Sequence, residues 1–493
     1  MEEKEYKFPS NNLLITNDLN IEIDKENEKE NIERFFESYR IDIDCKDVYV
    51  GINSITYVLD LKCKNRVSTI ESYKDDLLLY FNAVDINFKV AINGTPYLGI
   101  HIIKAKEKTL FLGNLIQDKE FVESTCKIPI IIGKNFENKL IIEDLTQLPH
   151  LLVAGSTGTG KSNFLSTIIV DIVYKLNPDE VKIFLVDTRK TNFERFNLIP
   201  HLLVPTITDC RKAIGILAFL EQEMRNRYQS FKEKRVDNID EYNRISEIRY
   251  PRFVAIIEDF YDLMMEEGKA VEEYMQLLIP MCRAAGIHVI ISTQRPSVNA
   301  ITGVIKANIP ARITFKLPSK VDSKTVINIA GAESLLLYGD VLFSKIGERS
   351  IERIQTPFIS DLEIQNVVDA IKNDNIREDF FQADIEKGDE KFVDEEDEID
   401  PFLFDAMELV INVGYASSSI IQKTFKVGYA RAGRMIDQLE QFGIISGYNG
   451  SRPRDVLITR DEFKELRKNL MHSWILGISK AMNREKIWKL KNY

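Results

Sequence analysis

The residues best suited to chemistry lie in a glycine-rich segment between an apolar run and a helical stretch. In order they are Gly155, Ser156, Thr157, Gly158, Thr159, Gly160, Lys161 and Ser162. Glycines in this setting let backbone N–H groups close around phosphate oxygens at the positive N-terminus of a helix. We expect Lys161 to reach the β- and γ-phosphates of ATP, and the Ser162 hydroxyl to ligate Mg²⁺.

Two acidic residues, Glu258 and Asp259, directly follow a second apolar run, Phe253–Ile257. A phosphoryl-transfer site needs one carboxylate for the Mg²⁺ shell and commonly a second that orients or deprotonates the attacking water. We therefore expect Glu258 to hold Mg²⁺ and Asp259 to orient or deprotonate the attacking water. The alternative is that the pair caps the helix that follows.

A third apolar run ends at Ser292, and Gln294 follows it closely. This spacing predicts that Gln294 senses the γ-phosphate, with a nearby arginine acting across a subunit boundary. An ordinary strand-end amide is the alternative. Asp187, which closes the run Val181–Asp187, either supports the site or caps a helix.

Short apolar runs alternate with helical stretches over residues 127–372, which indicates buried parallel strands joined by crossover helices. The sequence thus predicts an α/β P-loop ATPase domain there. Residues 32–126 show short alternating runs around one helical stretch and predict a small α+β domain. Residues 1–31 are polar and charged, and we expect a loose tail.

The charge is unevenly distributed along the 493 residues, whose net charge is −11. Residues 373–400 hold 13 acidic and 3 basic side chains, whereas residues 401–493 hold 15 basic and 9 acidic ones. This predicts an acidic linker before a basic module, so the overall negative charge does not exclude binding to nucleic acid.

Five scattered cysteines argue against a disulfide framework, and no apolar run is long enough for an intrinsic membrane span. We expect a cytoplasmic protein.

The combination of motifs resembles the FtsK/SpoIIIE family of bacterial DNA translocases. The resemblance extends from residue 32 to residue 459. Its motifs are the P-loop with its preceding strand, Ile199-Pro-His-Leu-Leu203, Arg283-Ala-Ala-Gly-Ile-His288, Ser292-Thr-Gln-Arg-Pro-Ser297, Ile301-Thr-Gly-Val-Ile-Lys-Ala-Asn-Ile-Pro310, Gly339-Asp340 and Val427-Gly-Tyr-Ala-Arg-Ala-Gly-Arg434.

The resemblance implies a RecA-like motor that assembles as a homohexameric ring around double-stranded DNA, with ATP bound between subunits. Three features depart from the family. The family's long membrane-anchoring N-terminal region has no counterpart here, the paired acids run Glu258-Asp259 instead of Asp-Glu, and Asp187-Thr-Arg-Lys190 replaces Asp-Pro-Lys. A carboxylate displaced by ~1 Å can cost ~10²-fold in rate.

Residues 401–459 read as three helices and a hairpin, and they resemble the family's C-terminal winged helix. We expect Arg431, Arg434, Asp437 and Gln438 to face the bases in the major groove, and Arg452 and Arg454 to contact phosphate. The alternative is a protein-binding winged helix with a solvated basic face. Residues 460–493 predict an amphipathic helical extension that packs on the winged helix or on a partner subunit. The alternative is binding to a membrane surface through Trp474, Trp488 and the lysines.

Our reading is an ATP-dependent DNA translocase that acts in chromosome segregation or in mobile-element DNA handling, with a separate membrane or recombinase partner. A coupling ATPase for conjugative DNA transfer is the first alternative. The second is a DNA-binding scaffold that holds ATP and hydrolyses it weakly.

Overall fold

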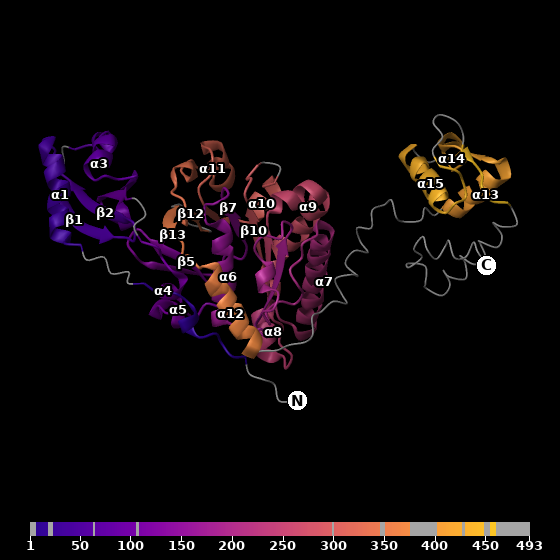
Figure 1. The fold of residues 1–493 in the computed structure, drawn as a ribbon, viewed down its shortest axis with the longest axis horizontal. Coiled ribbons are helices and arrows are strands. Elements are labelled where there is room, and N and C mark those ends of the chain that lie inside the picture. Colours follow the sequence, from indigo (N-terminus) through magenta and orange to yellow (C-terminus); the bar gives the residue numbers. More distant parts are fainter. Residues whose placement is uncertain are drawn as a thin grey trace. The chain divides into compact units, whose positions relative to one another are not determined.

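The computed structural model describes residues 6–17, 23–62, 65–104, 108–297, 300–345, 351–374, 402–425, 429–447 and 454–459. The chain forms two compact units, Met1–Asp389 and Glu390–Tyr493, which we describe in turn (Figure 1). The predicted acidic linker lies outside the described residues except for its first two positions. The predicted extension, residues 460–493, lies wholly outside them.

The first unit begins with a small α+β domain whose four antiparallel strands follow the order β1-β2-β4-β3. Its core packs α1 against the sheet and contains Phe35, Phe36 and Tyr57. The domain consists of α1 (Lys25–Ser38), β1 (Ile43–Val50), β2 (Ser54–Leu61), α2 (Val67–Glu71), α3 (Lys74–Tyr80), β3 (Asp85–Val90) and β4 (Leu98–Ile103).

The predicted boundaries of this domain need correction at both ends. The loose tail predicted for residues 1–31 is wrong where the structure describes it, because α1 begins at Lys25 and Tyr6 is buried in the motor core. The Tyr6 hydroxyl also donates a hydrogen bond to the carbonyl oxygen of Val173, at 3.1 Å. At the other end, α4 (Leu112–Ile116) and α5 (Lys119–Val122) also pack on the motor core, in which Leu112, Leu115, Ile116 and Phe121 are buried.

The motor is built on a nine-stranded sheet in the order β6-β5-β13-β12-β11-β7-β10-β9-β8. The five strands from β11 to β8 are parallel, as predicted for a P-loop fold, and antiparallel strands extend the sheet beyond β11. The strands are β5 (Pro129–Asn135), β6 (Leu140–Asp144), β7 (Leu151–Ala154), β8 (Val181–Asp187), β9 (Arg252–Glu258), β10 (Ile287–Thr293), β11 (Ala311–Thr314), β12 (Asp340–Ser344) and β13 (Glu352–Gln355).

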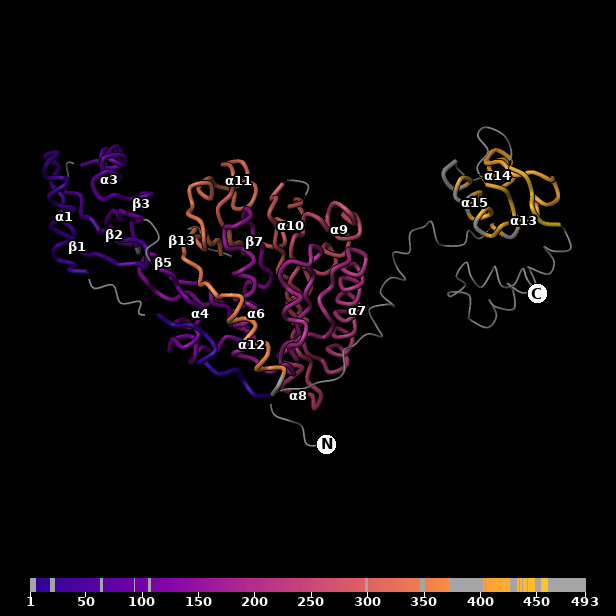
Figure 2. The backbone as a smooth tube through the Cα atoms, viewed as in Figure 1, coloured from indigo at the N-terminus to yellow at the C-terminus, as the bar shows by residue number. Residues whose placement is uncertain are grey.

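Helices cover both faces of this sheet, so neighbouring side chains of a strand enter different cores. Leu151 and Val153 join the core that contains α6 and α12, whereas Leu152 and Ala154 join the core that contains α7 and α9. These four helices are labelled in Figure 2. The motor helices are α6 (Lys161–Lys175), α7 (Cys210–Lys234), α8 (Ile239–Ile245), α9 (Phe260–Ala285), α10 (Gly303–Asn308), α11 (Lys320–Ile327) and α12 (Asp361–Asp374).

The second unit has the three helices and the small antiparallel pairing of a winged helix. Its core includes Met407, Ile421 and Leu439. The elements are α13 (Leu403–Val413), β14 (Tyr415–Ala416), α14 (Ser418–Phe425), α15 (Tyr429–Gln441) and β15 (Arg454–Asp455), with β14 paired to β15. Within the described ranges of both units, no helix is long and apolar enough to cross a membrane.

Candidate functional site

The glycine-rich segment forms the turn between β7 and α6. Gly158 and Gly160 have φ angles of 78° and 108°, in the left-handed region that favours glycine. A Cβ on Gly160 would lie 3.0 Å from the backbone nitrogen of Gly339, and one on Gly155 would lie 2.5 Å from the Cβ of Phe315. The turn therefore requires glycine, and it leads into the positive N-terminus of a 15-residue helix.

Lys161, the first residue of α6, turns its ammonium group inward. Its side chain is 3% exposed, and Nζ donates a hydrogen bond to Ser292 Oγ at 2.7 Å. Nζ also lies 3.4 Å from Glu258 Oε1, and Ser162 Oγ donates to the same oxygen at 2.5 Å. The predicted cation Lys161, hydroxyl Ser162 and carboxylate Glu258 therefore lie together, where the start of α6 meets the ends of β9 and β10.

Glu258 ends β9 and is fully buried. Its second oxygen, Oε2, accepts a hydrogen bond from Asn192 Nδ2 at 3.1 Å. The loop that delivers Asn192 is shaped by Asp187, whose Oδ2 accepts from the N–H groups of Thr191, Asn192 and Phe193 at 3.0, 2.8 and 3.1 Å. Asp187 therefore caps the turn and by doing so positions Asn192 beside the predicted metal ligand.

Asp259 occupies a costly conformation next to this cluster. Its φ of 53° places a non-glycine residue in the left-handed region at the N-cap of α9, and its side chain is 2% exposed. Neither of its carboxylate oxygens accepts a hydrogen bond from any residue that the structure describes. Arg189 Nε lies 3.3 Å from Oδ2 but donates its hydrogen bond to Asp262, at 2.6 Å. Burial raises the pKa of Asp259.

Gln294 lies against the glycine-rich turn, where its Oε1 accepts a hydrogen bond from Thr157 Oγ1 at 2.7 Å. Both residues line a cavity of about 290 Å³ together with the P-loop. The cavity is also lined by residues from two later segments, Tyr338, Gly339, Thr356, Pro357 and Phe358. None of these five residues was predicted to lie at the site, and Gly339-Asp340 in the family resemblance was the signal that could have located them.

These groups fit a magnesium nucleotide. Lys161 and the N-terminus of α6 suit phosphate oxygens, and the oxygens of Ser162 and Glu258 suit the hard cation. The Asp259 carboxylate, buried without a hydrogen-bond donor among the described residues, suits a polar partner at the site such as a water. Asn192 and Ser292 complete the surroundings, and sequence reasoning missed both because neither follows from the P-loop pattern.

Comparison with known proteins shows the family of the chain. A model of the FtsK/SpoIIIE family matches residues 112–298, one of the FtsK alpha domain matches residues 8–103, and one of the Ftsk gamma domain matches residues 397–459. The DNA translocase FtsK of Haemophilus influenzae is 36% identical over 488 residues, which cover 93% of this chain and 91% of that protein. The chain belongs to the FtsK/SpoIIIE family.

Other relatives in the family are longer than this chain. The DNA translocase FtsK of Caldanaerobacter subterraneus is 40% identical over 94% of this chain, and the DNA translocase SpoIIIE of Bacillus subtilis is 37% identical over 94%. The matches cover 66% and 61% of those two relatives. Among solved structures, the pCW3 conjugation coupling protein TcpA with ATPγS shares the fold, at 22% identity and a TM-score of 0.50, over 70% of this chain and 99% of that one.

The structure changes the reading of two candidate DNA-contacting residues in the FtsK gamma domain. Gln438 is 5% exposed, so the prediction that it reads bases is wrong for this conformation. Arg454 donates a hydrogen bond to Glu440 and is 13% exposed, so contact with phosphate would require it to leave that partner. Arg452 and the side chains of Arg431, Arg434 and Asp437 lie outside the described residues.

Proposed function

We propose that this chain is an ATP-driven motor that moves along double-stranded DNA as a homohexameric ring. The contact of Lys161 and Ser162 with Glu258 carries the proposal, because it joins a phosphate-binding cation to two oxygen ligands for Mg²⁺. The names of the curated relatives, DNA translocase FtsK and SpoIIIE, support movement on DNA. The proposed setting is cytoplasmic chromosome segregation or mobile-element DNA handling.

Each residue of the site has a distinct proposed task. Bound Mg·ATP supplies the scissile phosphoanhydride and a divalent cation that neutralises negative charge. Lys161 binds phosphate oxygens while Ser292 and Glu258 hold its ammonium group in place. Asp259 accepts a proton from the attacking water, and Gln294 orients toward the γ-phosphate from the P-loop wall of the cavity.

One observation favours a second candidate, a scaffold that binds ATP and hydrolyses it weakly. Asp259 carries a carboxylate one methylene shorter than the family's glutamate, and Arg189 lies close to it. A carboxylate that is one methylene shorter reaches less far toward a water, and a neighbouring arginine competes with that water for its oxygens.

The test is steady-state ATP hydrolysis by the full chain with no DNA, with linear duplex DNA and with single-stranded DNA of equal mass. A motor for duplex DNA shows turnover that rises on adding duplex and rises less with single strands. Binding of ATP without turnover in all three conditions would replace the motor with the scaffold.

A further inference from the structure

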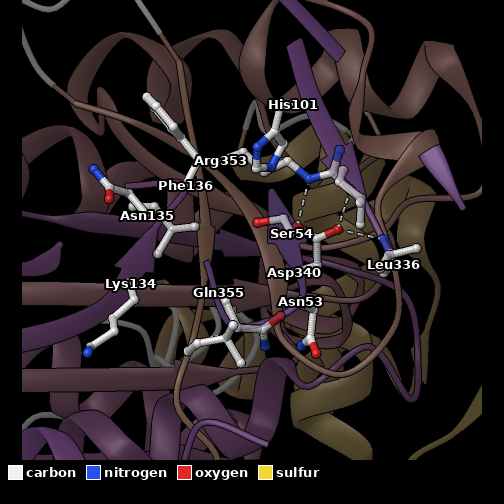
Figure 3. Close-up of a pocket in the computed structure, with 13 residues that line it drawn as sticks. Asn53, Ser54, His101, Lys134, Asn135, Phe136, Leu336, Asp340, Arg353 and Gln355 are labelled. Atoms are coloured by element: carbon white, nitrogen blue, oxygen red, sulfur yellow. Dashed lines mark hydrogen bonds and ion pairs between the residues drawn. The ribbon is translucent and has the colours of Figure 1, made fainter. Parts of the chain in front are cut away.

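A second charged cluster lies where the small domain meets the motor sheet (Figure 3). Arg353 of β13 donates two hydrogen bonds to Asp340 of β12, from Nε to Oδ1 at 2.9 Å and from Nη2 to Oδ2 at 2.6 Å. Its remaining nitrogen, Nη1, donates to Asp85 Oδ2 of β3 at 3.1 Å. The side chains of Arg353, Asp340 and Asp85 are at most 13% exposed. Because the Arg353 guanidinium bonds to a carboxylate of each domain, it joins the motor to the small domain.

Asp340 also fixes the turn that precedes it. Its Oδ2 accepts a hydrogen bond from the backbone N–H of Leu336 at 2.7 Å, and Figure 3 shows these two residues beside Arg353. Within the turn, Tyr338 and Gly339 have φ angles of 63° and 98°, a backbone that needs support from its surroundings. Both residues line the nucleotide cavity.

The same turn is tied directly to the P-loop. The N–H of Gly339 donates a hydrogen bond to the carbonyl oxygen of Thr159 at 2.9 Å, and the carbonyl oxygen of Gly339 accepts from the N–H of Thr356 at 2.7 Å. A continuous chain of contacts therefore runs from Asp85 through Arg353 and Asp340 to the phosphate-binding loop.

The cluster itself is not arranged as a ligand site. Lys74 Nζ lies 3.1 Å from Asp85 Oδ1, so two cations face two carboxylates. His101 is neutral because burial and Arg353 lower its pKa to about 3. The adjoining cavity of about 50 Å³ has room for ordered water but not for a nucleotide. The contacts suit a positioning role.

We propose that Arg353 is a positioning residue that couples the small domain to the nucleotide cradle. Through Asp340 it holds the Leu336–Gly339 turn against the P-loop, and through Asp85 it ties that turn to the small domain. A change in the position of the small domain should therefore change the affinity for nucleotide, and nucleotide binding should by the same amount favour one position of the small domain. The inference rests on nucleotide binding at the P-loop.

The test changes Asp85, which lies outside the nucleotide site. Asp85→Asn keeps the size of the side chain but removes its charge, and we expect the affinity for a fluorescent Mg·ATP analogue to fall about fivefold to tenfold. Asp85→Glu, which restores the carboxylate, should recover part of the affinity. The matched control is Asp42→Asn, which removes the ion pair with Lys62, 3.0 Å long, within the same domain and should leave affinity unchanged.

A measurement on the unmodified chain covers the case in which the variant folds poorly. Adding Mg·ATPγS should slow amide hydrogen exchange both in the P-loop and in β3 and β4 of the small domain. Protection of the P-loop alone, or equal affinities for Asp85→Asn and the unmodified chain, would overturn the coupling. Absence of nucleotide binding by the unmodified chain would instead overturn the proposed function.

Discussion

The Arg353 cluster and the nucleotide site, both in the first unit, differ in how completely their polar groups are hydrogen-bonded. Arg353 places three nitrogens on two carboxylates, and both oxygens of Asp340 accept hydrogen bonds. In the nucleotide site, the buried Asp259 carboxylate accepts no hydrogen bond from the described residues. A saturated cluster fixes geometry, whereas a cluster with unmet bonding capacity is suited to take up a ligand.

The two clusters share one backbone feature. Asp259, in the nucleotide site, has a left-handed φ. Near the Arg353 cluster, Tyr338 and Gly339 also have left-handed φ angles, and both line the nucleotide cavity. Contacts with a bound ligand can offset the cost of such a backbone conformation.

Lys161→Ala should have the largest effect, because it removes the buried cation of the phosphate site. We expect kcat for ATP hydrolysis to fall by about 10²–10³-fold, and kcat/KM to fall further because nucleotide binding is weakened as well. Hydrolysis rates and Mg·ATP titrations measure both. Retention of full activity would remove the P-loop from the mechanism.

Asp259→Asn should separate binding from chemistry. The amide cannot accept a proton, so we expect kcat to fall by about 10²-fold while the affinity for ATP is retained. A nearly unchanged kcat would show that the Asp259 carboxylate is not the base. Capping of α9, the alternative considered for the acidic pair, is not what holds this side chain, because it makes no capping hydrogen bond. Nucleotide titration of the same variant is the control for correct folding of the site.

The double change Glu258→Asp with Asp259→Glu restores the family's order of acids and tests whether the site is built around a longer first carboxylate. The glutamate side chain of Glu258 is long enough to accept hydrogen bonds from Lys161, Ser162 and Asn192. Withdrawing it by one methylene should break these contacts and lower kcat by about one order of magnitude. An increase in kcat would mean that the surroundings have not adapted to glutamate.

The pH dependence should show the smallest change. Since burial raises the pKa of Asp259, hydrolysis should decline on acidification at a higher pH than the ordinary aspartate value of 3.8 would give. The acid limb of the kcat profile measures this pKa, and Asp259→Asn should abolish it. The raised pKa also affects stability. As pH rises from 3.8 through the pKa of Asp259 in the folded state, ionisation of this buried carboxyl should lower the free energy of unfolding.

The sequence predicted the parts of the fold and site that depend on local pattern. The P-loop, the parallel strands and the acids at the end of β9 follow from apolar runs and the residues that end them. Contacts between distant segments could not be predicted this way, and Arg353 and Asp85 are 268 positions apart. Gln438 was misassigned because it lies beside the apolar stripe of α15, where packing against neighbouring segments buries it.

The most direct test of the central claim is the displacement of a third strand from linear duplex DNA by the full chain in the presence of Mg·ATP. The account predicts displacement that requires hydrolysable ATP, is absent with ATPγS and is absent for Lys161→Ala. Hydrolysis of ATP at a normal rate on the same DNA without displacement of the third strand would contradict the claim that this site powers movement along duplex DNA.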